Sequence, residues 1–73
     1  MAETVNADMS ANVWKIVVAA GDAVDTDDTL LILESMKMEI PVLAESDGVI
    51  TDIHVTEGAT VNAGDPLVTI DDS

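Results

Sequence analysis

Lys37 is the residue of this 73-residue chain best suited to chemistry, and it lies between Met36 and Met38 in the stretch ESMKME. The chain has only two basic residues but fifteen Asp or Glu, so a cation flanked by apolar side chains is unusual here. A free lysine amine is almost entirely protonated near pH 7 and is then a poor nucleophile. No His or Tyr lies near Lys37 in the sequence to act as its base. We therefore expect another enzyme to modify this lysine, rather than the lysine to act as a catalyst.

Other residue types offer little for catalysis or metal binding. The chain has no Cys, which excludes disulfides and thiolate metal sites, and its single His argues against a structural metal site. No acid and base, and no nucleophile beside a His, are predicted to converge, so an enzyme is not indicated. His54 lies between Ile53 and Val55, so alternation along a strand turns its side chain outward as an ordinary exposed residue. Lys15 is likewise interpreted as a solvated charge.

The net charge of −13 is large for a chain of this length. Such a surface repels phosphate backbones and anionic lipid headgroups, so neither nucleic acid nor a membrane is expected as a partner. It could steer the protein toward basic patches on partner enzymes, or be no more than a solvated acidic face. Neither a secretory signal nor an apolar stretch of about 20 residues is present. We expect a soluble cytoplasmic protein.

The chain contains an internal repeat, in which residues 5–33 align with residues 42–70 without gaps at an offset of thirty-seven positions. Such self-similarity indicates two copies of one supersecondary unit. The identical pairs are Val5 and Val42, Ala7 and Ala44, Ile16 and Ile53, Val18 and Val55, Gly21 and Gly58, Val24 and Val61, Asp28 and Asp65, and Leu30 and Leu67.

Each copy has the pattern of an all-β unit, with short apolar runs separated by glycine-containing or acidic turns. A core rich in Val, Ile and Leu, without Phe or Tyr, also favours sheet over helix. Each half is too small to bury its own apolar face. We therefore predict one domain over residues 1–73, a flattened β-barrel or sandwich of two four-stranded sheets with pseudo-two-fold symmetry. Its halves, 5–33 and 42–70, are joined by a hairpin at 34–41.

Two local assignments follow from the pattern. Alternation predicts that Ile16, Val18, Ile53 and Val55 face inward, whereas a bulge would decide the orientation of Trp14. Residues 30–39 consist of good helix formers, but the repeat aligns 30–33 with the strand-like segment 67–70, which opens with Pro66. We therefore predict strands at 30–33 and 40–44, connected by the six residues 34–39.

This connection has the wrong residues for a tight hairpin turn, which favours Asn, Asp or Gly. Met36 and Lys37 are predicted near its tip instead, which suggests that function selected them. The alternative is that Met36 and Met38 fill the core and Lys37 is an ordinary surface charge. Their position in the repeat favours the functional interpretation.

From residue 5 to residue 70 the chain resembles the biotinyl domain of biotin carboxyl carrier proteins. The resemblance rests on the Met-Lys-Met turn, the repeat, the paired glycine turns and the segment NAGDPL at 62–67. It implies that Lys37 carries covalent biotin and that a ligase recognises Met36 and Met38. The sequence departs from the family at Ser35, where Ala is frequent, and at Asp8, where Pro is common. Asp27 replaces the glycine of the second copy, and Asp tolerates a left-handed turn conformation.

The resemblance further implies a non-catalytic carrier, a monomer when alone, that is modified by a biotin protein ligase using a biotinyl adenylate. Its biotin would shuttle carboxylate from a biotin carboxylase to a carboxyltransferase. Tethering would hold the cofactor near each active site at an effective concentration of order millimolar. Carriers for acetyl, propionyl, pyruvate and urea substrates share this turn, so it does not specify the carboxyl acceptor.

Two other classes compete with this interpretation. A lipoyl domain has the same fold and a hairpin lysine, but there the lysine usually follows Asp and precedes Ala or Val, so Met36 and Met38 favour biotin. An unmodified docking or interaction module would require the Met-Lys-Met turn to be accidental. The mass of the intact protein after expression with a biotin ligase distinguishes all three.

Overall fold

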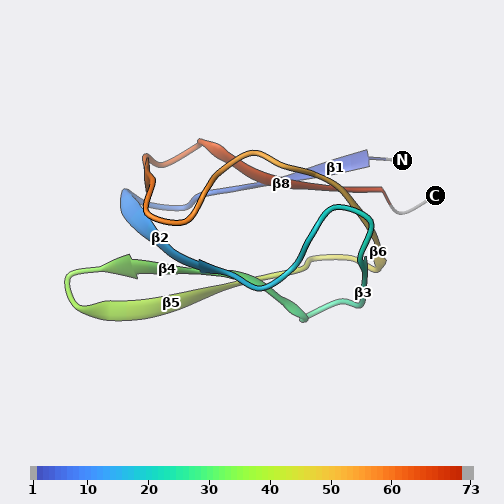
Figure 1. The fold of residues 1–73 in the computed structure, drawn as a ribbon, viewed down its shortest axis with the longest axis horizontal. Coiled ribbons are helices and arrows are strands. Elements are labelled where there is room, and N and C mark those ends of the chain that lie inside the picture. The colour runs from blue at the N-terminus through green and yellow to red at the C-terminus, as the bar shows by residue number, and fades with distance from the viewer. Residues whose placement is uncertain (1, 72–73) are drawn as a thin grey trace.

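The structure, a computed structural model, describes residues 2–71 and consists of eight β-strands with no helix among those residues (Figure 1). This confirms the predicted all-β class and the strand assignment around residues 30–33. The strands are β1 Ala2–Asn6, β2 Ala11–Ile16, β3 Ala23–Val24, β4 Thr29–Ser35, β5 Met38–Leu43, β6 Gly48–Ile53, β7 Thr60–Val61 and β8 Pro66–Asp71. Within the described range no helix exists that is long and apolar enough to cross a membrane.

The strands form two four-stranded sheets in which every neighbouring pair is antiparallel. One sheet has the order β1-β8-β6-β3 and the other β5-β4-β2-β7. Exchanging each strand for its repeat counterpart converts the first order into the second, so the predicted pseudo-two-fold symmetry is confirmed. Each sheet contains two strands from each half. The halves are therefore interleaved, because neither copy forms a complete sheet from its own strands.

Backbone hydrogen bonds in the turns repeat with the same symmetry. The Ala7 N–H donates to the Asp65 carbonyl at 2.9 Å, and the Ala44 N–H donates to the Asp28 carbonyl at 2.8 Å. The left-handed turn position of the first copy is Asp27, with φ 74°, and its counterpart Gly64 has φ 91°. The expectation that Asp would accept this conformation is thus confirmed.

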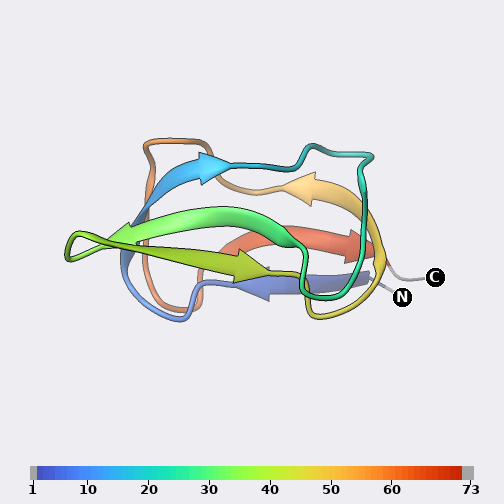
Figure 2. The same cartoon turned by 90° about the horizontal axis from the view of Figure 1, so that it is seen from below.

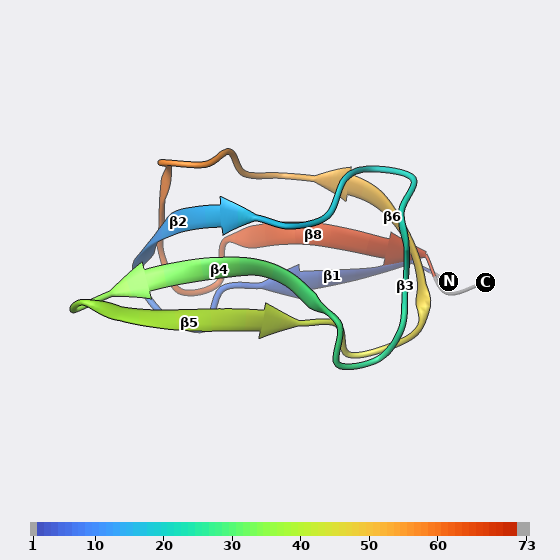
Figure 3. The ribbon, with the colours of Figure 1, turned by 60° about the horizontal axis from the view of Figure 1, so that its bottom comes forward.

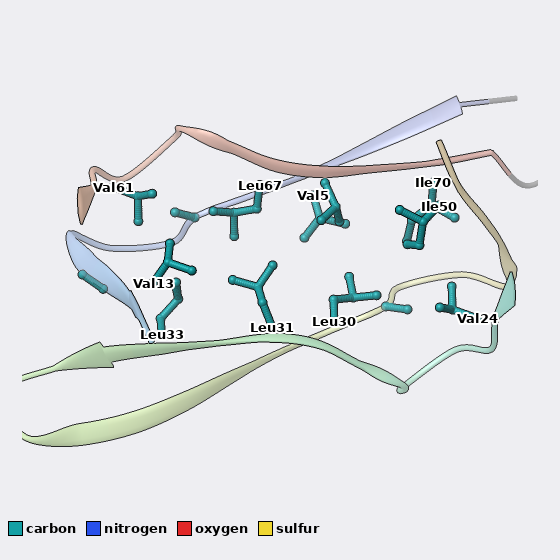
Figure 4. Close-up of a cluster of buried hydrophobic side chains, with 14 residues drawn as sticks. Val5, Val13, Val24, Leu30, Leu31, Leu33, Ile50, Val61, Leu67 and Ile70 are labelled. Atoms are coloured by element: carbon teal, nitrogen blue, oxygen red, sulfur yellow. The ribbon is translucent and has the colours of Figure 1, made fainter. Parts of the chain in front are cut away.

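The core is a layer of aliphatic side chains between the two sheets (Figure 4). Its most completely buried side chains are Leu30, Leu31, Ile50, Leu67, Ile70, Val13 and Val68. No polar or charged side chain is buried among residues 2–71. Hydrophobic burial between the sheets is therefore the main source of stability.

Bulges change which side chains occupy the centre of the core. The register shifts in β2 between Val13 and Lys15, and in β6 between Ile50 and Asp52. Each bulge places the preceding residue in the interior. Ile16, Val18, Ile53 and Val55, which alternation assigned to the inward face, are partly buried and pack at the margin of the core. Trp14 lies in the first bulge and is half exposed.

The molecule is elongated, with extents of 36 × 18 × 17 Å. The β4–β5 hairpin projects beyond the sandwich at one end, and the N- and C-terminal strands meet at the other end (Figures 1 and 2). The turn that carries Lys37 is therefore supported by paired strands and lies far from the residues where β1 begins and β8 ends.

Candidate functional site

Met36 and Lys37 alone form the turn between β4 and β5, because Ser35 pairs directly with Met38. The sequence predicted a connection of six residues. In the structure this connection has only two residues, because the paired strands also include Glu34, Ser35, Met38 and Glu39. Both turn residues have positive φ, 53° and 64°, the signature of a type I′ hairpin turn.

These two φ values are unfavourable for side chains of this size. A left-handed conformation costs roughly 1–2 kcal/mol for a residue other than glycine, and type I′ turns normally use Asn-Gly. The pairs Glu34–Glu39 and Leu33–Ile40 behind the turn hold its geometry in place. Strain retained at two adjacent positions, where Gly would relieve it, points to a requirement for these particular side chains.

All three residues of the Met-Lys-Met triplet are exposed. Met36 is 92% exposed and Met38 63%, so the alternative that they fill the core is wrong. Within residues 2–71 the Lys37 ammonium has neither a hydrogen-bond nor an ion-pair partner. A primary amine that is accessible from solvent and not engaged by its own protein suits amide formation with a carboxylic acid cofactor.

The other polar candidates lie away from this turn. His54 faces outward as predicted, and its Nε2 lies 2.7 Å from Oγ1 of Thr69 on the neighbouring strand. In the described range no three His, Cys, Asp or Glu side chains are placed to hold a metal ion. Neither His54 nor a metal cluster therefore adds a second candidate site among residues 2–71.

Sequence reasoning missed a groove of about 270 Å³ that lies between β1 and β5. Figure 3 shows the course of these two strands, which are edge strands of the two sheets. Its lining includes Asp8 and Met9 from the β1–β2 connection and Ile40 and Val42 from β5. The sequence marked Asp8 only as a departure from the family pattern. Nothing local could have shown that this connection lies against β5, because the contact joins residues more than thirty positions apart.

Comparison with protein families settles the class of this hairpin lysine domain. The biotin/lipoyl family model, described as "Biotin-requiring enzyme", matches residues 3–70. The chain belongs to the biotin/lipoyl family. This confirms the resemblance drawn from the Met-Lys-Met turn and the repeat, and biotin is the cofactor that the family description names.

Similar proteins within the biotin/lipoyl family include small carriers. The biotin/lipoyl attachment protein of Bacillus subtilis is 43% identical over 70 residues, which cover 96% of both chains. The biotin carboxyl carrier protein of Streptococcus mutans is 46% identical over 69 residues, which cover 94% of this chain but only 53% of that protein. The family module thus occurs both as nearly a whole protein and as part of a longer one.

A solved structure shows the same biotin/lipoyl fold inside a large enzyme. The Kluyveromyces lactis urea carboxylase superposes with a TM-score of 0.91 at 35% sequence identity. The matched region covers 97% of this chain and 6% of the carboxylase chain. The predicted two-sheet architecture is therefore confirmed by an independent structure as well as by the strand order.

Proposed function

We propose that this chain is a biotin carrier in which the Nζ atom of Lys37 is the attachment point. The observation that carries the proposal is an unpartnered lysine at the tip of a strained two-residue turn, between two exposed methionines, in a member of a biotin-requiring family. Residues 1–73 act together as one carrier domain. The same family includes a protein named for attachment of biotin or lipoyl groups, so lipoylation is the second candidate.

A biotin protein ligase supplies the activation that the lysine lacks. The amine loses a proton and attacks the carbonyl carbon of biotinyl adenylate, so that a C–N amide bond forms, the acyl–phosphate C–O bond breaks and AMP leaves. Met36 and Met38 give the ligase an apolar surface on either side of the amine. The turn contributes access, because the β4–β5 hairpin that carries Lys37 projects beyond the sandwich (Figure 1).

The carrier itself is non-catalytic and works with a biotin-dependent carboxylase. When attached, biotin supplies a ureido ring that accepts and releases a carboxylate. The aliphatic side chain of Lys37 lengthens the arm on which biotin moves between a biotin carboxylase and a carboxyltransferase. Tethering keeps the cofactor near each active site at an effective concentration of order millimolar. The acidic surface limits self-association, so the carrier is a monomer when alone. A cytoplasmic location suits a chain without Cys.

Intact-mass measurement after co-expression with a biotin ligase tests the proposal. The expected result is a single biotinyl increment that is lost in Lys37→Arg and retained in the matched control Lys15→Arg. A lipoyl increment after co-expression with a lipoyl ligase, without a biotinyl one, would support the second candidate instead. No increment with either ligase would leave an unmodified interaction module as the better description.

A further inference from the structure

The groove between β1 and β5 runs along β5, the strand that begins next to Lys37. Its floor includes the buried Leu33, and its walls include the half-buried Ile40 and Val42 and the more exposed Met9. Asn6 and Asp8 provide the polar part of the lining. At about 270 Å³ it lies just below the ~300 Å³ lower end of small-molecule pockets, which suits a bicyclic ring rather than a peptide.

We propose that this groove is the resting site of the biotin ring carried by Lys37. The inference rests on the proposed function, because it requires the cofactor to be attached there. The ring would leave solvent between reactions by folding back along β5. The proposal assigns a role to Asp8 and Met9, which the Met-Lys-Met turn alone does not explain.

The reach of the arm matches the position of the groove. Eleven bonds separate the Lys37 Cα from the biotin ring, and an extended chain of bonds near 1.5 Å at angles of about 111° spans roughly 14 Å. A strand advances about 3.4 Å per residue, so Ile40 lies about 10 Å and Val42 about 17 Å along β5 from Lys37. The ring therefore reaches the part of the groove between these two residues. Figure 2 shows that the β1–β2 connection lies toward the same end of the molecule as the β4–β5 hairpin.

The lining matches the hydrogen-bonding groups of a ureido ring. That ring has two N–H donors and one carbonyl acceptor, while Asp8 offers carboxylate acceptors and Asn6 an amide that both donates and accepts. Asn6 ends β1 and Asp8 lies in the connection that follows it, and both line the groove on either side of the buried Ala7. Within residues 2–71 neither side chain has a hydrogen-bond partner in the protein. The thioether of Met9 and the aliphatic wall of β5 can cover the apolar face of the ring.

The carboxylates that line the groove favour an uncharged biotin ring over an anionic ligand or an acidic peptide. Asp8 and the other carboxylates of the groove, Asp27 and Glu45, would repel an anionic ligand or an acidic peptide. The biotin ring is uncharged, and it can use the carboxylate as an acceptor. The dithiolane ring of a lipoyl group is also uncharged, but it has no N–H donor for Asp8.

Nuclear magnetic resonance of the unmodified and biotinylated forms of the whole chain tests the proposal. Biotinylation should shift the amide signals of Met9, Val42 and Leu43 as well as those of the turn. Nuclear Overhauser contacts should connect the ureido protons to the Met9 methyl group. Shifts confined to residues 35–39, without such contacts, would overturn the resting site.

Avidin capture of the biotinylated chain gives a second readout. If the groove holds the ring half of the time, capture is about twofold slower than for a freely exposed ring. Asp8→Ala should remove that delay, whereas Asp52→Ala, on the outer side of β6, should leave it unchanged. Equal capture rates for all three proteins would contradict the proposal.

These results separate the two levels of inference. Absence of biotin on Lys37, measured by intact mass before either experiment, would contradict the proposed function. A fully biotinylated chain whose ring contacts neither Met9 nor Val42 would contradict only the resting site.

Discussion

At the scale of single residues, the turn holds Met36 and Lys37 in a left-handed backbone conformation. The contacts of their own side chains do not offset the free-energy cost of that conformation. Met36 is 92% exposed and has φ 53°, so its side chain adds almost no packing while its backbone is strained. The paired strands behind it must offset that cost. The fold therefore tolerates Met36 but does not depend on it, which allows folding and recognition to be separated experimentally.

Replacing Met36 with Gly should stabilise the protein and impair its modification. Relief of the left-handed strain, reduced by the greater freedom of Gly in the unfolded chain, should raise the free energy of unfolding by about 1 kcal/mol. Urea denaturation measures this change. The same variant should be biotinylated more slowly, because it lacks one of the two apolar side chains that we propose the ligase recognises.

Met38→Ala is the matched control for that variant, because Met38 lies in a strand without positive φ. It should slow biotinylation without stabilising the fold. A Met36→Gly protein that is modified at the wild-type rate would contradict a recognition role for Met36.

The composition of the turn could be recognised from the sequence, but its length could not. Met and Lys at a hairpin tip contradict the usual turn residues, and this conflict drew attention to Lys37. Strand pairing at Glu34, Ser35, Met38 and Glu39 lies beyond the core, so hydrophobic alternation gives no signal for it. The helix propensities of the residues in this segment also favoured a helix rather than two paired strands.

At the scale of elements, β6 begins at a position where only Gly fits. A Cβ on Gly48 would lie 2.5 Å from the carbonyl oxygen of Asp71 and 2.7 Å from Cγ2 of Ile70. Both atoms belong to β8, the neighbouring strand in the sheet. The close approach of β6 to β8 is therefore set by the absence of a side chain.

Gly48→Ala should force these strands apart and destabilise the protein. Overpacking of this kind typically costs about 1–3 kcal/mol, and urea denaturation again provides the measurement. Val49→Ala, one residue further along and partly exposed, is the control and should cost less. A Gly48→Ala protein as stable as wild type would show that β8 moves away without cost.

A carboxylate connects two loops at the end of the sandwich opposite the hairpin. Asp47, just before β6, accepts hydrogen bonds from the Thr26 N–H at 2.7 Å and from its hydroxyl at 2.9 Å. These bonds, first to the backbone and then to the side chain, lower the pKa of Asp47 from its ordinary value of 3.8. Ionised Asp47 is therefore favoured by folding.

The stabilisation from Asp47 should be present above pH 3.8 and should disappear as the pH falls through its lowered pKa. Unfolding measured between about pH 6 and pH 2 should show wild type more stable than Asp47→Asn at the upper end, with the difference shrinking in acid. A difference that stays constant over this range would contradict the linkage.

The positions of the bulges show why the core could be predicted only in part. The repeat predicted that Val13 and Ile50 would occupy equivalent places, and they do. Apolar residues occupy both parities of these strands, and alternation assigned Ile16, Val18, Ile53 and Val55 to the inward face, whereas the structure places them at the margin of the core. The bulges after Val13 and Ile50 determine which side chains face the centre of the core, and no local residue pattern marks these bulges.

At the scale of the whole molecule, a net charge of −13 on a body 36 Å long produces a strong negative potential. In the proposed carrier, the amine of Lys37 loses its positive charge when it forms the amide, so the net charge of the turn becomes more negative. Long-range attraction to basic partner surfaces then affects how fast complexes form more than how tightly they hold.

Association of the carrier with its ligase should therefore slow as salt increases. The screening length falls from about 30 Å at 0.01 M to about 3 Å at 1 M, so stopped-flow association rates should drop across this range. The double variant Glu34→Gln, Glu39→Gln should associate more slowly at low salt than wild type. Rates independent of salt would contradict electrostatic steering.

The pairing of Ala2 with Asp71 is the repeat counterpart of the pairing of Glu39 with Glu34 in the hairpin. The two chain-end strands therefore meet at the pole opposite Lys37. In any longer chain that contained this fold, the connections before β1 and after β8 would start at that pole. A domain attached in this way would pivot about that pole, and its 36 Å length would set most of the radius through which Lys37 swings. The flexible arm contributes only about the last 14 Å of that radius.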